Sequence, residues 1–244
     1  VQSRIAMNDI HLTFFVLLTL WLFKVWQKQK SWWRLGLVGL SAGLSLGTKW
    51  SGLFVLAAVW LLLIWDWLSS LMAINFKLKT SLKSNLKSGL GQFLWAIFAL
   101  ILIPALVYLA SYGQMFLQGK GWTHFVELHQ QIWGYQTSLK ATHAYQSRPW
   151  EWFLNLRPVW FHVDHVAQTK IANIYAFGNP VLFWFGAVSV VWTTLIWLIT
   201  SLNRVIIQGK NRIDTITNHF LQLQAVSQLL ITYFLLWLPW VFSP

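Results

Sequence analysis

Long apolar runs separated by short polar connections dominate the chain. Within each run nearly every residue is apolar, whereas in an amphipathic helix of a soluble protein the apolar residues recur on one face only. Runs of about 20 apolar residues are typical of helices that cross a lipid bilayer. The pattern predicts an all-α polytopic membrane protein with about six transmembrane helices, over 10–26, 35–48, 51–74, 90–112, 180–200 and 220–242.

The second run, 35–48, is short and rich in glycine. As a helix it would rise only about 21 Å, less than the hydrocarbon core of about 30 Å. Gly39, Gly43 and Gly47 recur at every fourth position, which places small residues on one helix face where a neighbouring helix can approach closely. We therefore expect this helix to cross the membrane sheltered by its neighbours, with its glycine face buried.

Charge is scarce and strongly positive. Only 10% of the residues are charged, whereas soluble domains average about 25%, and the formal net charge is +12. The Lys and Arg residues cluster in short connections between apolar runs, which is typical of topology signals and argues against nucleic-acid binding. The three clusters are Lys24, Lys28, Lys30 and Arg34; Lys77, Lys79, Lys83 and Lys87; and Arg204, Lys210 and Arg212.

The positive-inside rule assigns these three connections to the cytoplasm, provided that the short helix 35–48 crosses. The chain then divides into membrane helices over 1–112, an extracytoplasmic loop over 113–171, and further membrane helices over 172–244. Within the loop, the pattern at 116–134 predicts an amphipathic helix on the outer membrane surface. Aromatic residues at Trp150, Trp152 and Trp160 suit an interfacial belt, a sugar-stacking platform, or both.

Several polar residues could carry chemistry near the outer surface. Arg4 and Asp9, at the mouth of the first run, could bind a lipid phosphate or orient an acceptor hydroxyl, or could simply cap the helix. Lys49, at the outer end of the glycine-rich helix, could meet a phosphate or snorkel to the headgroups.

Metal and nucleotide chemistry have little support in the sequence. His124, His129, His162 and His165 have spacings that helices could bring together, but no metal-binding motif accompanies them, so we expect no metal site. Phosphate-loop and dinucleotide fingerprints are absent, and the chain has no Cys, which excludes thiol chemistry and disulfides.

Three strings in order resemble the protein O-mannosyltransferases, which are C-type membrane glycosyltransferases. SRIAMNDIHLTFF at 3–15 is similar to their SRxAMLDxxLxxF segment, and GLSLGTKWSGL at 43–53 to their GLxxGxKWxGL junction. In the loop, the third string, Tyr135 with ATHAYQSRPW at 141–150 and then LRPVWF at 156–161, resembles their Y…ATHPYxSxPW…LRPVWF run. Asn8 and Ala144 depart from the family's usual Leu and Pro.

The resemblance implies a partial C-type glycosyltransferase fold in a bacterial plasma membrane, working on its extracytoplasmic face. A polyprenyl-phosphate-mannose donor would transfer mannose, with inversion, to Ser or Thr of exported proteins, and no further cofactor is implied. By resemblance, Arg4 and Lys49 hold the donor phosphate, Asp9 organises the site, and His143 and Arg157 serve the acceptor or the loop.

The family's main acidic residues lie upstream of its SRxAMLD segment. We therefore expect the chain to be a piece of a longer protein, missing an amino-terminal part with the catalytic base and truncated at its other end. The loop is too short for the β-trefoil domain of the eukaryotic enzymes, which favours a prokaryotic form.

Two alternatives stay open. A protein of the same fold could transfer another sugar, or could transfer it to a lipid acceptor. The chain could instead be a transporter or scaffold subunit, although we find neither inverted repeats nor ionisable residues near mid-membrane.

Overall fold

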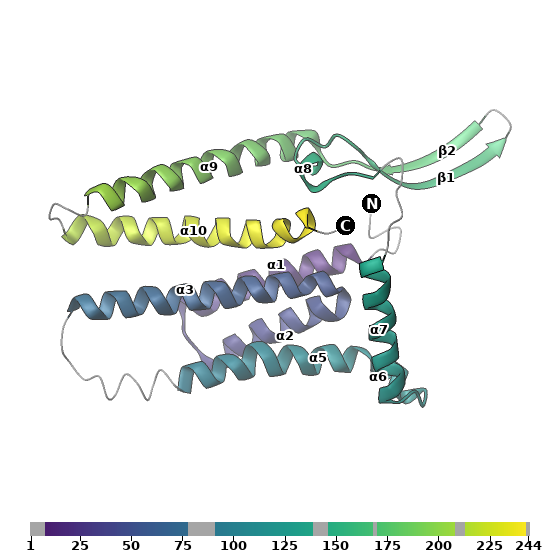
Figure 1. Ribbon diagram of the computed structural model, residues 1–244, viewed down its shortest axis with the longest axis horizontal. Helices are drawn as coiled ribbons and strands as arrows, with labels where there is room; N and C mark the ends of the chain where they lie inside the picture. The colour runs from purple at the N-terminus through teal and green to yellow at the C-terminus, as the bar shows by residue number, and fades with distance from the viewer. Residues whose placement is uncertain (1–7, 78–90, 139–145, 168–169, 208–212, 243–244) are drawn as a thin grey trace. The chain divides into compact units, whose positions relative to one another are not determined.

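A computed structural model describes residues 8–77, 91–138, 146–167, 170–207 and 213–242 (Figure 1). The chain forms two compact units, Val1–Ser138 and Leu139–Pro244. The division predicted at 112/113 falls between two helices of the first unit, and the one predicted at 171/172 falls inside a strand of the second.

The first unit is helical throughout its described part. A helical stretch over 91–97 continues through a π-turn into α5, so that Gly91–Ser111 is one long apolar helix. The elements are α1 (Asp9–Lys28), α2 (Trp32–Thr48), the 3-10 turn η2 (Trp50–Gly52), α3 (Leu53–Lys77), the π-turn η3 (Phe98–Leu102), α5 (Ile103–Ser111), α6 (Gly113–Leu117) and α7 (Trp122–Ser138).

Helix α2 runs back along the whole length of α1. It starts just after the end of α1, and Lys49, the residue after its last turn, contacts Asp9 at the start of α1. Between these ends, the buried Thr19 hydroxyl donates to the Ser41 hydroxyl (2.9 Å). With 17 residues, α2 rises about 25 Å. The helix thus extends from the end of α1 back to its start, and its crossing of the membrane stays a prediction.

The glycine face of α2 packs against η3 and α5, which confirms that it is buried in protein. A Cβ added to Gly39 would lie 1.7 Å from the carbonyl oxygen of Ala99, and one added to Gly43 would lie 2.7 Å from Cβ of Val107. The π-turn explains the first contact. The Ile103 N–H bonds to the Phe98 carbonyl, and Pro104 has no N–H, so the Ala99 oxygen is directed out of the helical ladder.

The second unit contains two long helices and a β-hairpin. Its elements are α8 (Pro149–Trp152), β1 (Val159–Ala167), β2 (Lys170–Ala176), α9 (Pro180–Ile207) and α10 (Ile213–Val241). Strands β1 and β2 pair antiparallel, with Trp160 opposite Tyr175 and Asp164 opposite Ala172. Helix α9 begins at Pro180, as predicted, and the Asn179 carboxamide accepts the Val181 N–H there (3.0 Å).

The hairpin was not predicted. Its base is closed by Asn155, whose side chain accepts the Gly178 N–H (3.3 Å) and donates to the Gly178 carbonyl. Because Val159–Ala167 is a strand, the helical spacing considered for His162 and His165 does not apply. The membrane helices of this unit begin at Pro180, because β2 extends to Ala176.

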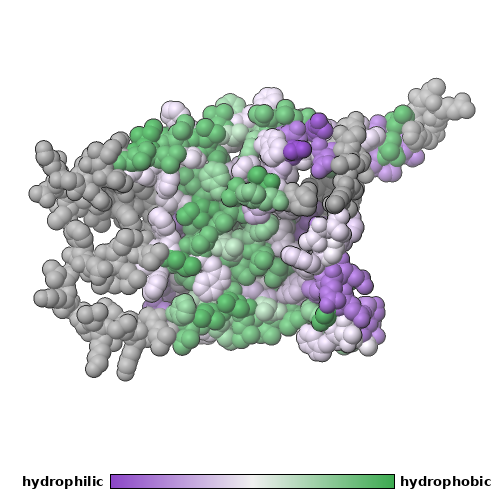
Figure 2. Space-filling model, in the orientation of Figure 1, coloured by the Kyte–Doolittle hydropathy of each residue, from purple (hydrophilic) through white to green (hydrophobic). Residues whose placement is uncertain are grey.

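Within the described residues, four helices are long and apolar enough to cross a membrane: Asp9–Lys28, Trp50–Trp67, Gly91–Ser111 and Pro180–Leu202. A shorter apolar helix covers Ala225–Val241. No residue in the apolar window of Pro180–Leu202 is buried, so this helix exposes side chains such as Phe185 and Trp192. In Figure 2 apolar residues cover α9, while polar residues gather over α6 and α7. These helices confirm the polytopic membrane class, and the count of six stays a prediction.

Candidate functional site

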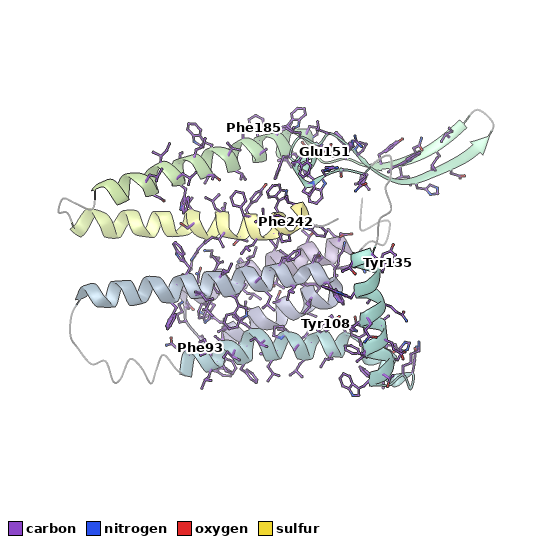
Figure 3. The ribbon with its side chains drawn as sticks, in the orientation of Figure 1. Phe93, Tyr108, Tyr135, Glu151, Phe185 and Phe242 are labelled. Atoms are coloured by element: carbon purple, nitrogen blue, oxygen red, sulfur yellow. The ribbon has the colours of Figure 1, made fainter. Side chains whose placement is uncertain are left out.

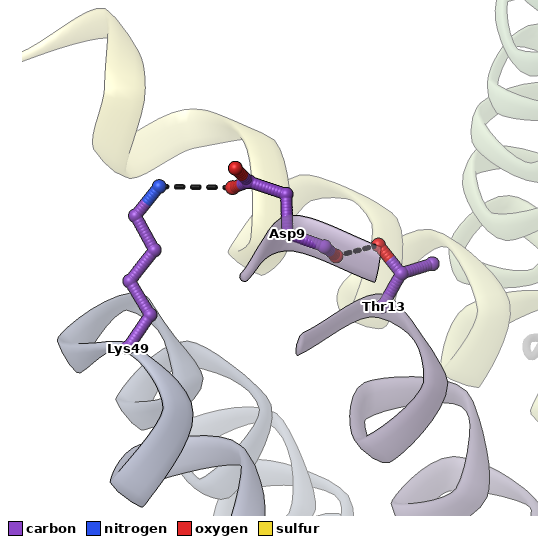
Figure 4. A network of polar contacts seen from close by, with 3 residues as sticks. All are labelled: Asp9, Thr13 and Lys49. Carbon is purple, nitrogen blue, oxygen red and sulfur yellow. Dashed lines mark hydrogen bonds and ion pairs between the residues drawn. The ribbon is translucent and has the colours of Figure 1, made fainter. Parts of the chain in front are cut away.

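An ion pair joins the start of α1 to the end of α2. The Lys49 ammonium lies 2.9 Å from an Asp9 carboxylate oxygen (Figure 4), and both side chains are accessible, with exposed fractions of 47% and 31%. A carboxylate is favourable in the first turn of a helix and an ammonium near the last turn, because each complements the helix dipole. The sequence placed both residues at the outer surface, but their pairing appears only in the structure.

The backbone at Lys49 is fixed by a close approach to α2. Its N–H bonds to the Ser45 carbonyl (3.1 Å), and its own carbonyl accepts the Gly52 N–H (2.8 Å). A Cβ at Gly52 would lie 2.4 Å from the carbonyl carbon of Ser45. Only glycine fits this turn without displacement, which explains why the Lys-Trp-Ser-Gly string ends as it does.

Next to Lys49, a network of aromatic side chains connects three elements. The Trp50 indole N–H donates to the Tyr108 hydroxyl (2.7 Å), which also lies 2.7 Å from Nε2 of His129 and 3.0 Å from the Tyr112 hydroxyl. Figure 3 shows Tyr108 near the end of α5, beside α7. Burial, followed by the hydrogen bond with Tyr108, raises the pKa of Tyr112.

Sequence reasoning missed this network. The sequence suggested His129 as a possible metal ligand beside His124, yet among the described residues no three His, Asp or Glu side chains gather as a metal site would require. The spacing of Tyr108 and Tyr112 places both on one helix face and offered a signal. Their partners Trp50 and His129 are far away in the sequence, which hid the contact.

The remaining predicted site residues are only partly described. Arg4 and His143 lie outside the described residues. Arg157 lies in the second unit, before β1, where its guanidinium donates to the Gln146 carbonyl (3.1 Å). This contact ties together two parts of the loop.

The geometry at Asp9 and Lys49 suits an anionic ligand. An ammonium has three N–H donors, and within the described part of the chain the Lys49 ammonium bonds to Asp9 alone. Lys28 and Lys30 lie at the turn between α1 and α2. The accessible Asp9–Lys49 pair lies at the opposite end of these two helices. A phosphate could therefore bind the ammonium while the carboxylate holds it in place.

Both halves of the chain match sequence models of one family. Residues 1–117 match "Dolichyl-phosphate-mannose-protein mannosyltransferase", and residues 121–243 match the "C-terminal four TMM region of protein-O-mannosyltransferase". The chain belongs to the protein O-mannosyltransferase family. The match confirms the family inferred from the three motif strings, and the first model includes the Asp9 and Lys49 site.

Curated relatives of this protein O-mannosyltransferase family member are named polyprenol-phosphate-mannose–protein mannosyltransferase. The protein from Corynebacterium glutamicum is 25% identical over an alignment covering 79% of this chain and 46% of the relative. That from Mycolicibacterium smegmatis is 27% identical over 68% of this chain and 37% of the relative. That from Mycobacterium tuberculosis is 29% identical over 64% of this chain and 34% of the relative.

The chain thus spans less than half the length of the curated relatives it matches. No solved structure matches it.

Proposed function

We propose that the chain is part of a bacterial plasma-membrane enzyme that transfers mannose from a polyprenyl-phosphate donor to Ser or Thr hydroxyls of exported proteins. The observation that carries the proposal is the accessible Asp9–Lys49 pair at the end of apolar helices, inside the region that matches the transferase model. The names of the bacterial relatives support the donor and the protein acceptor.

The distribution of charge supports an extracytoplasmic location for this site. Lys24, Lys28, Lys30 and Arg34 lie toward the turn between α1 and α2, whereas Lys49 lies at the other end of the same helices. By the positive-inside rule, the turn faces the cytoplasm. Asp9 and Lys49 then meet the outer leaflet, where a lipid-linked sugar would present its phosphate.

The proposed reaction is a single displacement at the anomeric carbon of mannose. The acceptor hydroxyl oxygen attacks C1 from the face opposite the phosphate, and its proton passes to a carboxylate base. As the new C1–O bond forms, the bond between C1 and the phosphate oxygen breaks, and its electron pair stays on the leaving polyprenyl phosphate. The Lys49 ammonium stabilises that developing negative charge, and Asp9 orients the ammonium.

We propose that the base itself lies outside this chain. Asp9 is engaged by Lys49 (2.9 Å), and Glu151 accepts the backbone N–H of Arg148 (2.7 Å). Of the six Asp and Glu residues of the chain, these two thus have structural partners that suit positioning better than proton abstraction. The chain would then bind the donor without transferring its sugar.

The test is a mannose-transfer assay in nanodiscs, with radiolabelled polyprenyl-phosphate-mannose and a Ser/Thr-rich peptide. The chain is assayed with the Corynebacterium glutamicum relative as a positive control, and donor binding is measured in parallel for the chain and for Lys49→Met. We expect transfer by the relative only, donor binding by the chain, and weaker binding by the variant.

Each other outcome has a definite meaning. Mannose transfer by this chain, as well as by the relative, would show that the chain contains its own base. Equal binding by wild type and Lys49→Met would remove Lys49 from the phosphate site. Binding of a different polyprenyl-phosphate sugar in preference to the mannose donor would favour the related transferases, and no binding of any such lipid would favour a scaffold role.

A further inference from the structure

The His129 ring of α7 sits among four aromatic rings at the outer end of the first unit. Its ring centroid lies 4.1 Å from Phe125, 5.3 Å from Tyr112, 5.7 Å from Tyr108 and 5.8 Å from Trp50. The Trp50 ring stacks on it at an interplanar angle of 27°. This cluster joins α7 to α5 and to the turn η2 that directly follows Lys49.

The hydrogen bonds of the cluster can be assigned a direction from their partners. Nδ1 of His129 lies 2.7 Å from the Phe125 carbonyl, an acceptor, so this nitrogen carries the proton. In the neutral ring Nε2 then accepts, and the Tyr108 hydroxyl donates to it. The Tyr108 oxygen in turn accepts from the Trp50 indole N–H, which can only donate, and from the Tyr112 hydroxyl.

Every polar group in this chain of contacts therefore has a partner, and each bond depends on the next. Without the Tyr108 hydroxyl, His129 loses its donor and the part-buried Trp50 N–H loses its acceptor. Trp50 immediately follows Lys49, whose backbone is extended (φ −162°, ψ 143°) between α2 and η2. The direction in which the Lys49 side chain leaves the backbone thus depends on whether Trp50 keeps its hydrogen bond to Tyr108.

We propose that Tyr108 and His129 are positioning residues that hold Lys49 in its phosphate-binding orientation through Trp50. This inference rests on the proposed function, because it assumes that Lys49 binds the donor phosphate. The contacts run from His129 on α7 through Tyr108 on α5 to Trp50, and from Lys49 to Asp9 on α1. Docking of the outer helix α7 thereby controls the affinity of the site for a polyprenyl phosphate.

The first measurement is binding of farnesyl phosphate to the chain in nanodiscs of neutral phosphatidylcholine. Tyr108→Phe removes one oxygen and keeps the ring, and we expect it to weaken binding about threefold to tenfold, the usual effect of one or two lost hydrogen bonds. Tyr135→Phe is the matched control, because Tyr135 is exposed on α7 and the same change should leave binding as in wild type.

Two further comparisons separate positioning from general destabilisation. In a Lys49→Met background, Tyr108→Phe should have no additional effect on binding, because the proposed effect of Tyr108 on the ligand acts through the Lys49 ammonium. His129→Gln retains a side-chain oxygen that can accept the Tyr108 proton, so it should bind farnesyl phosphate more tightly than His129→Ala. A purely structural role would give additive losses and no rescue.

Hydrogen–deuterium exchange supplies a readout that needs no ligand. The amides of Lys49 and Gly52 are bonded to the Ser45 and Lys49 carbonyls, and Tyr108→Phe should speed their exchange while Tyr135→Phe does not. Unchanged exchange would overturn the linkage between α7 and the Lys49 turn.

The outcomes distinguish the inference from the proposed function. If Lys49→Met binds farnesyl phosphate as well as wild type, the phosphate site is wrong, and exchange alone then decides whether the linkage exists. If Lys49→Met binds weakly but Tyr108→Phe binds normally, the phosphate site stands and the positioning role is refuted. A loss from Tyr108→Phe that persists undiminished beside Lys49→Met would also refute it.

Discussion

Replacing Gly39 by Ala should destabilise the first unit more than any other glycine-to-alanine change along α2. The added Cβ would lie 1.7 Å from the Ala99 carbonyl oxygen and 2.9 Å from its carbonyl carbon. A carbon and a carbonyl oxygen approach each other to about 3.3 Å in close helix packing. Helix α2 and the π-turn η3 would therefore have to separate locally by about 1.6 Å, the difference between these two distances.

The obstacle is backbone, so it cannot rotate aside as a side chain can. Inserting a methyl or methylene group into a packed core usually costs about 1–3 kcal/mol, and we expect the upper end of that range here. For a protein of this size, about 3 kcal/mol lowers the melting temperature by about 6–12 °C.

Thermal unfolding in detergent, followed by circular dichroism, measures this effect. Gly36→Ala is the matched control on the same helix, because its Cβ would meet Cδ1 of Ile103 at 3.7 Å and Cζ2 of Trp95 at 3.9 Å, which are ordinary contacts. It should melt at or above the wild-type temperature, since Ala favours helix over Gly. If Gly39→Ala melts with wild type, α2 does not approach η3 as closely as described, and the reasoning fails.

Three further changes test other contacts. Asn155→Ala should cost about 2 kcal/mol, because it removes two bonds at the base of the hairpin and places Ala at a positive φ of 56°; faster amide exchange in β1 and β2 would reveal it, and unchanged exchange would contradict it. Thr19→Val should cost only about 0.6 kcal/mol in unfolding, since Ser41 keeps its bond to a backbone carbonyl; a loss of several kcal/mol would contradict this. The pKa of Tyr112 is raised by burial and by its bond with Tyr108, so the folded state keeps its proton longer than the unfolded one and loses stability as the pH rises above about 10; Tyr112→Phe should reduce that alkaline loss in a pH series of melting temperatures.

The membrane helices could be predicted because each is encoded locally. Continuous apolar runs identified them, and the spacing of Gly39, Gly43 and Gly47 identified the face of α2 that packs against another helix. What the spacing could not reveal is the partner. The contact of Gly39 with Ala99 depends on the π-turn before Pro104, and this irregularity has no periodic signal.

The site was predictable only residue by residue. Asp9 and Lys49 each lie at the end of an apolar helix, and the motif strings included both, but their pairing across 40 positions is a tertiary contact. The network of Trp50, Tyr108 and His129 was missed for the same reason, since each of these residues has an ordinary local explanation as an interfacial aromatic or a surface histidine.

The hairpin was missed although its sequence carried a signal. Val159–Ala167 and Lys170–Ala176 contain several β-branched and aromatic residues, which favour strands. The histidines within the first segment were compared at helical spacing instead, because the surrounding composition is that of a helical membrane protein. An isolated two-stranded hairpin is marginal in water, and the Asn155 contacts at its base help to explain its presence.

The π-turn at Phe98–Leu102 also sets the phase of the helix that it interrupts. Such a turn holds about one residue more than an α-helical turn, so the half that follows is rotated by about 100° from where an uninterrupted helix would place it. Tyr108 faces Trp50 and His129 only in this phase. Converting the π-turn to a regular α-helix without removing a residue would leave hydropathy and length almost unchanged, yet it would turn Tyr108 away from both partners. A change among the apolar residues, which leaves the predicted topology unaltered, would thus remove the contacts that hold Trp50 beside Lys49.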